Sequence, residues 1–273
     1  MLVKSLVAAN VAAMMFVFVI LSGATSCSIE KVKETFPAPS SGDILVMMID
    51  TGIDADHKLL KDYVDRSRSV DLEDGDDQGD AHGTHVAGLI VYGRTIDEGH
   101  PVGLCHRVRI ISCNKLHRDN SDIPACLDLA LKMGVQYINI SGGGDKAMPL
   151  ERTLMQELDS KGVVIVMAAG NENNDLAEKP YYPASYKLKH SIVVANGTDR
   201  EHKALTSNYG TDVVWEWGSD VLSTAPMDRF DRMTGTSQAA PIRLHKILMS
   251  LCETGVNYKL YNAPFRDTMV RYK

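Results

Sequence analysis

The stretch "MMIDTGID", residues 47–54, ends an apolar run with an aspartate, a threonine and a glycine. An Asp-Thr-Gly at such a place allows three interpretations. Asp50 could be half of the carboxylate pair of an aspartic protease, it could orient a histidine, or it could simply lead a strand into a turn. The rest of the chain has to decide among them.

Similar apolar segments recur along the chain. They are short and rich in Val and Ile, which is typical of strands in a parallel sheet that is covered on both faces. These segments are residues 43–50, 108–116, 136–141, 163–170 and 191–197.

Patterns typical of helices lie between these strands. The segment 121–135 has its apolar residues on one helical face, namely Ile123, Cys126, Leu127, Ala130 and Leu131. The segment 150–162 repeats the pattern through Leu150, Leu154 and Leu158. The alternation of strand and helix predicts an α/β fold in three layers, with a mostly parallel central sheet and helices on both of its faces.

Polar residues stand at several predicted strand ends. Asp50, Ser141 and Asn171 each lie at or just past the end of an apolar run. In open α/β sheets, sites form beyond the carboxyl ends of the strands. We therefore expect the chemistry of this chain at that edge.

Three further stretches carry groups suited to nucleophilic catalysis: "AHGTHVAG" (81–88), "AAGNEN" (168–173) and "MTGTSQAAP" (233–241). A hydroxyl nucleophile needs a base to take its proton, and the base works best when a carboxylate fixes its tautomer. The oxyanion that forms needs hydrogen-bond donors aimed at it. The sequence offers one residue for each role, in the order Asp50, His82, Asn171 and Ser237.

These segments resemble those of the subtilisin-like serine proteases, the subtilase family. "IDTGID", "HGTHVAG" and "GTSQAAP" are similar to the three signature segments of that family and stand in its order. "YINISGGG" resembles its substrate-binding strand, and "AAGN" resembles its oxyanion segment. The resemblance implies a subtilisin-like fold and a serine endopeptidase that acts through an acyl-enzyme.

The resemblance also implies a role for each matched residue. Asp50 would orient His82, His82 would be the general base, Ser237 the nucleophile at a helix start, and Asn171 an oxyanion donor. The substrate backbone would pair with Ser141, Gly142 and Gly143 as an added strand. Small residues that include Ala169 and Gly170 would floor the S1 pocket, where we expect a large apolar side chain to fit.

Other classes of protein fit the sequence less well. An aspartic protease needs two such carboxylates, and the chain has one "DTG". His82 and His85 have no convincing third zinc ligand nearby, so we expect no metal there and His85 packed within its own helix. An esterase would carry a G-x-S-x-G elbow, and this sequence has none. The main alternative is a catalytically silent peptide-binding or scaffolding lipoprotein on the same fold.

The N-terminus differs in character from the rest of the chain. The apolar run 6–21 is short for a membrane span, so residues 1–27 are interpreted as an export signal. "GATSC" resembles a bacterial lipoprotein site, which would make Cys27 the lipidated residue; ordinary cleavage and an uncleaved anchor are alternatives. A polar spacer, 28–42, would precede a catalytic domain over 43–273.

The other four cysteines, Cys105, Cys113, Cys126 and Cys252, allow three disulfide pairings. Cys113 and Cys126 both have apolar neighbours, and the preferred interpretation is that they are small buried residues without a bond.

Charge limits the partners of the protein. A net charge of −6 without a basic run argues against nucleic acid, and we expect a monomer that acts on polypeptides and is tethered to a membrane at its N-terminus. The loop 71–80 holds six carboxylates. We interpret it as a solvated loop, with calcium binding as the alternative. The spacer is too short for the long propeptide of many family members, so the domain is expected to fold unaided or with a separate chain.

Overall fold

The computed structural model describes residues 42–70, 81–114, 116, 123–198 and 202–254. The elements lie in the order β1 (Ile44–Asp50), α1 (His82–Tyr92), β2 (Val108–Asn114), α2 (Ile123–Met133), β3 (Tyr137–Ile140), α3 (Pro149–Ser160), β4 (Val164–Ala168), η2 (Ala184–Tyr186), β5 (Ser191–Gly197), β6 (Val213–Trp217), β7 (Val221–Ala225), β8 (Arg229–Met233) and α4 (Thr236–Thr254).

The central sheet has six strands in the order β2-β1-β3-β4-β5-β6, and all five pairings are parallel. The chain begins in β1, moves to β2 on one side, and then crosses to β3 on the other side of β1. Such a reversal opens a space between the loops that leave neighbouring strands, at their carboxyl ends. Asp50 ends β1 and therefore stands at this point.

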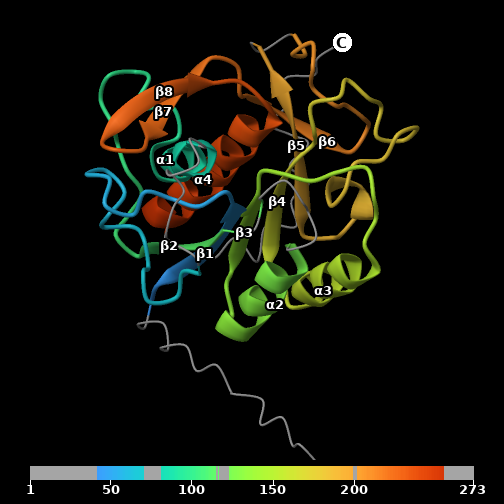
Figure 1. Ribbon diagram of the computed structural model, residues 1–273, viewed down its shortest axis with the longest axis horizontal. Helices are drawn as coiled ribbons and strands as arrows, with labels where there is room; N and C mark the ends of the chain where they lie inside the picture. The colour runs from blue at the N-terminus through green and yellow to red at the C-terminus, as the bar shows by residue number, and fades with distance from the viewer. Residues whose placement is uncertain (1–41, 71–80, 115, 117–122, 199–201, 255–273) are drawn as a thin grey trace, which may run out of the picture. The chain divides into compact units, whose positions relative to one another are not determined.

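Helices cover both faces of the sheet (Figure 1). Along β1, Val46 and Met48 belong to the core beneath α1 and α4, whereas Met47 and Ile49 belong to the core beneath α2 and α3. All seven residues of β1 are buried because neighbouring side chains point to opposite, covered faces. The predicted three-layer α/β fold is confirmed.

Three strands escaped the sequence analysis, namely β6 and the antiparallel pair β7 and β8. The β7–β8 hairpin packs against α1, where Ser223 Oγ donates a hydrogen bond to the His85 carbonyl at 2.8 Å and Thr224 Oγ1 donates one to the Thr84 carbonyl at 2.7 Å. Gly88 permits this close packing, since a Cβ there would overlap the hydroxyls of Ser223 and Thr224.

The predicted face of α3 is wrong in part. Leu158 is buried as expected, but Leu150 is 60% exposed, and Glu151 and Met155 are buried in its place. On this face the Glu151 carboxylate hydrogen-bonds the side chain of Tyr186, which also receives the Met148 N–H at 2.9 Å. Burial raises the pKa of Glu151. A hydrophobic pattern cannot foresee a buried glutamate.

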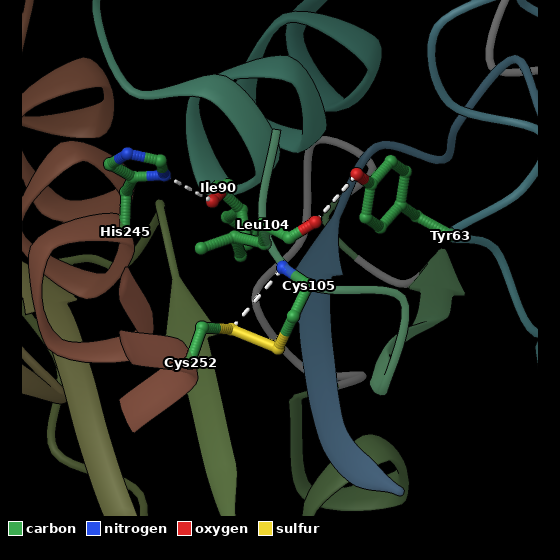
Figure 2. Close-up of a disulfide and its surroundings, with 6 residues drawn as sticks. All are labelled: Tyr63, Ile90, Leu104, Cys105, His245 and Cys252. Carbon is green, nitrogen blue, oxygen red and sulfur yellow. Dashed lines mark hydrogen bonds between the residues drawn. A yellow bond between two sulfur atoms is a disulfide. The ribbon is translucent and has the colours of Figure 1, made fainter. Parts of the chain in front are cut away.

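The preferred interpretation of the cysteines is wrong. Cys113 and Cys126 are fully buried as expected, but they form a disulfide between β2 and α2, with their Cα atoms 5.9 Å apart. Cys105 and Cys252 form a second disulfide, which ties the chain before β2 to the end of α4 (Figure 2). Apolar neighbours could not reveal either pair, because α2 and α4 meet their partners only through the tertiary fold.

Candidate active site

Asp50 and His82 form a hydrogen-bonded pair at the carboxyl edge of the sheet. The carboxylate of Asp50 is fully buried, and its Oδ1 lies 2.7 Å from His82 Nδ1. The Thr51 backbone N–H donates to the same oxygen at 2.8 Å. Because a carboxylate only accepts, Nδ1 carries the proton and Nε2 carries the lone pair of the neutral ring. The side chain of His82 is 25% exposed, so its ring borders solvent.

The start of α1 fixes the position of His82, the first residue of that helix. The Gly83 N–H donates to Thr51 Oγ1 at 3.0 Å, which ties the helix start to the turn after β1. A Cβ at Gly83 would overlap the Gly52 carbonyl oxygen. Only glycine therefore lets the two segments approach closely enough for the contact between His82 and Asp50.

Ser237 lies in the first turn of α4, as the sequence predicts. Its hydroxyl donates to the Ser141 carbonyl at 3.0 Å, and Ser141 Oγ donates to the Ser237 carbonyl at 2.9 Å. Asn139 Nδ2 donates to Ser141 Oγ at 2.9 Å. These bonds join the helix start to the end of β3. The positive end of the α4 dipole favours an anion at this point.

Asn171 is held beside Ser237 by the intervening Thr236. The side-chain carbonyl oxygen of Asn171 accepts the Thr236 N–H at 3.0 Å and the Thr236 hydroxyl at 3.2 Å. Thr236 Oγ1 in turn accepts the Gly170 N–H at 3.1 Å. With its oxygen engaged in this way, the amide of Asn171 presents its NH₂ end as the donor.

The predicted substrate segments follow two neighbouring strands. Ser141, Gly142 and Gly143 come directly after β3. Gly142 packs against Leu116, whose Cδ1 would lie 2.6 Å from an added Cβ. After β4, Ala169 is fully buried, and its N–H donates to the Val194 carbonyl at 2.9 Å. Ala169 thus supports the site from within the sheet, and the predicted contacts of these segments with substrate stay predictions.

Several supporting residues were absent from the sequence analysis. Thr51 donates to Asp50, Asn139 to Ser141, and Thr236 orients Asn171. Thr236 lies inside "GTSQAAP" and Thr51 inside "IDTGID", so the motifs contained both residues without indicating their roles. Asn208 has no such signal, although its Nδ2 donates to the Ala169 carbonyl at 2.9 Å.

His85 packs elsewhere than expected. It is fully buried, and its Nε2 lies 3.1 Å from the carbonyl oxygens of both Val221 and Asp231, in the β7–β8 hairpin rather than in its own helix. Burial lowers the pKa of His85 to about 4, so the ring is neutral at pH 7. His85 thus joins α1 to the β7–β8 hairpin.

Some predictions fall outside the described residues. These are the export signal 1–27, Cys27, nearly all of the spacer 28–42, and the acidic loop 71–80 with its calcium alternative. Among the residues that the structure describes, no helix is both long and apolar enough to cross a membrane.

Fold and site together define a class. A parallel α/β sheet carries, at its carboxyl edge, an Asp–His pair, a serine at a helix start and an anchored asparagine amide. These are the groups, in the chain order Asp, His, Ser, from which a triad serine hydrolase would be built.

Comparison with known proteins identifies the family within that class. The sequence pattern of the Subtilase family matches residues 41–242. The chain is 33% identical to the thermophilic serine proteinase of Bacillus sp. (strain AK1) over 72% of its own length and 49% of that protein. It is 30% identical to the intracellular serine protease of Paenibacillus polymyxa over 72% of its length and 63% of that protein. The chain therefore belongs to the subtilase family of serine proteases.

Solved structures agree with this assignment. The protease domain of PatA matches with a TM-score of 0.64 and 26% identity over 78% of this chain and 81% of that one. A cold-adapted subtilisin-like serine proteinase matches with a TM-score of 0.64 and 24% identity over 81% of this chain and 80% of that one, which supports the fold alone. The chain spans about half to two thirds of the length of the two curated relatives.

Proposed function

We propose that this protein is a serine endopeptidase that hydrolyses peptide bonds through an acyl-enzyme. The observation that carries the proposal is the 2.7 Å contact between Asp50 Oδ1 and His82 Nδ1, made by a fully buried carboxylate. A buried carboxylate hydrogen-bonded to Nδ1 fixes the tautomer of the histidine ring and stabilises its protonated form. The curated relatives are named as serine proteases, which supports the same activity.

The first half of the reaction uses Ser237 as nucleophile. Its hydroxyl leaves the Ser141 carbonyl and passes its proton to His82 Nε2 while Oγ bonds to the substrate carbonyl carbon. The resulting imidazolium is stabilised by Asp50. The carbonyl oxygen becomes an oxyanion, to which the NH₂ group of Asn171 and the backbone N–H of Ser237 donate.

The second half releases the products. The tetrahedral intermediate expels the amine, which takes the proton from His82, and the acyl group stays on Ser237 Oγ. Water then attacks the acyl carbon while His82 accepts its proton. In a second collapse the C–Oγ bond breaks, His82 returns the proton to Ser237 Oγ, and the acid is freed. Pairing of the substrate backbone with Ser141–Gly143 would hold the chain extended for both steps.

A hydrolysis assay tests the proposal. The purified chain should cleave an unfolded polypeptide, Ser237→Ala should not, and Ser160→Ala, which changes an exposed serine at the end of α3, should behave as wild type. Binding of peptide without cleavage by a folded wild-type chain would contradict the proposal and favour the silent peptide-binding alternative. Hydrolysis of simple esters but not of peptides would favour an esterase.

We also propose export, with Cys27 as the site of lipidation. Two disulfides, Cys105–Cys252 and Cys113–Cys126, support an oxidising location, because such bonds seldom persist in a reducing cytosol. Metabolic labelling with a lipid precursor should mark the wild type but not Cys27→Ala. If the protein is released in soluble form without the lipid label, simple cleavage of the signal would be supported instead. If the protein is found in the cytosol with both cysteine pairs reduced, export would be contradicted.

A further inference from the structure

The ring of Tyr181 lies between the two chain segments that follow β3 and β4. A Cβ added to Gly143 would lie 2.7 Å from Tyr181 Cε1, and a Cβ added to Gly170 would lie 3.0 Å from Tyr181 Cδ2. Cε1 and Cδ2 are on opposite edges of a phenol ring. The ring therefore spans from one glycine segment to the other, and it would overlap a Cβ at Gly143 and press against one at Gly170.

The backbone on either side of Tyr181 is fixed. Tyr182 and Gly144 exchange two backbone hydrogen bonds, at 2.8 and 2.7 Å, which joins this stretch to the segment after β3. The Tyr181 N–H donates to Ser185 Oγ at 3.1 Å, and the Ser185 N–H donates to the Tyr181 carbonyl at 2.8 Å. The backbone that carries the ring is thus fixed by the fold.

Tyr181 has a charged neighbour in Glu172. Burial raises the pKa of the Tyr181 hydroxyl to about 12, and the Glu172 carboxylate adds to the rise. Asn208 Nδ2 holds Glu172 Oε2 at 2.6 Å, and that oxygen would lie 2.6 Å from a Cβ on Gly170. The Cδ2 edge of the Tyr181 ring and a fixed carboxylate together occupy the space beside Gly170, whereas the hydroxyl-bearing side of the ring lies toward Gly143.

The scissile carbonyl must sit between Ser237 and Asn171. The residue that supplies it, P1, pairs its backbone with Ser141–Gly143 under the proposed function, so its side chain enters between the segments after β3 and β4. That is the space which Tyr181 spans. We infer that Tyr181 is a specificity-determining residue which restricts P1 to glycine, alanine or serine. This inference rests on the proposed function and replaces the expectation that small residues make a deep apolar pocket.

Paired substrates test the inference. With peptides that differ only at P1, the wild type should cleave after alanine with kcat/KM about 10-fold or more above that after phenylalanine. Tyr181→Gly should raise the ratio of phenylalanine to alanine cleavage by about 10-fold or more, because removing the ring opens the space. Tyr181→Phe keeps the ring and is the matched control, so its preference should stay with alanine.

Two outcomes overturn the inference. A wild type that prefers phenylalanine or leucine at P1 overturns the inference without any variant. This outcome can be measured even if Tyr181→Gly fails to fold. A folded Tyr181→Gly chain whose P1 preference is the same as that of the wild type also overturns the inference.

Failure of the proposed function looks different. In that case neither substrate is cleaved. The inference can then be tested by measuring how tightly peptides bind to the Ser237→Ala variant, since binding needs no hydrolysis. A peptide ending in alanine should bind that variant more tightly than one ending in phenylalanine. Equal binding or the reverse order contradicts the role of Tyr181.

Discussion

At the scale of single residues, Asp50 works through one oxygen. Oδ1 accepts both from His82 Nδ1 and from the Thr51 N–H, so two donors hold this oxygen in place beside the imidazole. Thr236 has a similar supporting role, because it engages the oxygen of Asn171 and leaves the NH₂ group as the donor. These contacts fix geometry before any substrate arrives, which is the condition for electrostatic stabilisation of an oxyanion.

Asp50→Asn should abolish most of the activity. An asparagine can turn its NH₂ group toward His82 Nδ1, which stabilises the tautomer with its proton on the wrong nitrogen. In another family of triad proteases the equivalent change lowers kcat by ~10⁴-fold, and we expect a similar fall in peptide hydrolysis. Asp62→Asn, at an exposed position, should keep activity within about twofold. A loss below about 10-fold for Asp50→Asn would contradict the role of the carboxylate.

Thr236→Val should lower kcat with little change in KM. The variant removes the hydroxyl that joins Asn171 to the Gly170 N–H, so the oxyanion donor is less well oriented. We expect a fall in kcat of about 10-fold, less than the ~10²–10³ caused by removal of such a donor. Thr234→Val, two residues earlier in an exposed position, is the control. A change confined to KM would argue for a substrate contact instead.

At the scale of elements, the buried faces of α3 and α1 contain polar side chains with specific partners as well as apolar ones. Glu151 is buried with Tyr186, and His85 is buried against two carbonyl groups of the hairpin. Both groups are held where a simple hydrophobic pattern would place an aliphatic side chain.

The rotation of α3 predicts which substitutions cost stability. Met155→Ala empties a fully buried position and should lower the free energy of unfolding by about 2–5 kcal/mol. Leu150→Ala, on the exposed face, should change it by no more than about 0.5 kcal/mol. Urea unfolding of the two variants measures both values. The reverse order would mean that the helix packs through Leu150 after all.

His85 should make the protein acid-sensitive. Its pKa is about 4 in the folded chain and 6.5 without the fold, so between these values the unfolded state binds the extra proton. Stability is then present above pH 6.5 and falls as pH drops toward 4, by up to about 3 kcal/mol. Burial also lowers the pKa of His245, which acts in the same direction.

A comparison of variants isolates the contribution of His85. Unfolding of His85→Gln should depend less steeply on pH over this window than unfolding of the wild type. Ser160→Ala, at an exposed position and without a titratable group, should keep the wild-type slope. Equal slopes for all three proteins would show that His85 is not responsible.

At the scale of the whole molecule, the Cys105–Cys252 disulfide joins residues that are 147 positions apart. Figure 2 shows it between the chain beside Leu104 and the last turns of α4, the helix that starts at the candidate nucleophile. The Leu104 carbonyl accepts from the Tyr63 hydroxyl at 2.8 Å, so the anchor point of the disulfide is itself held in place. The disulfide therefore connects the far end of α4 to the amino end of β2.

Loss of this disulfide should destabilise the protein strongly. Closing so long a loop restricts the unfolded chain by about 5 kcal/mol in the chain-entropy description, and measured effects usually fall between 2 and 5 kcal/mol. Cys105→Ala with Cys252→Ala should lower the free energy of unfolding by about 2–5 kcal/mol under oxidising conditions. In reductant, wild type and variant should converge. No difference under oxidising conditions would contradict a formed bond.

The sequence allowed prediction of the sheet, its coverage and the order of the candidate triad, because continuous apolar strands and short motifs are local signals. It could not reveal contacts that depend on the assembled fold. Tyr181 lies ten residues past Asn171 with no motif of its own, yet the fold places it between Gly143 and Gly170. The face of α3 and the disulfides were missed for the same reason, since each depends on a partner distant in sequence.

The central claim is that Ser237 is an activated nucleophile, and covalent labelling tests it most directly. The purified chain would be treated with a fluorophosphonate probe, and the modified residue located by mass spectrometry. We predict a single adduct on Ser237, absent in Ser237→Ala and slowed in Asp50→Asn. A folded wild-type chain that remains unlabelled, or an adduct on another serine, would contradict the account.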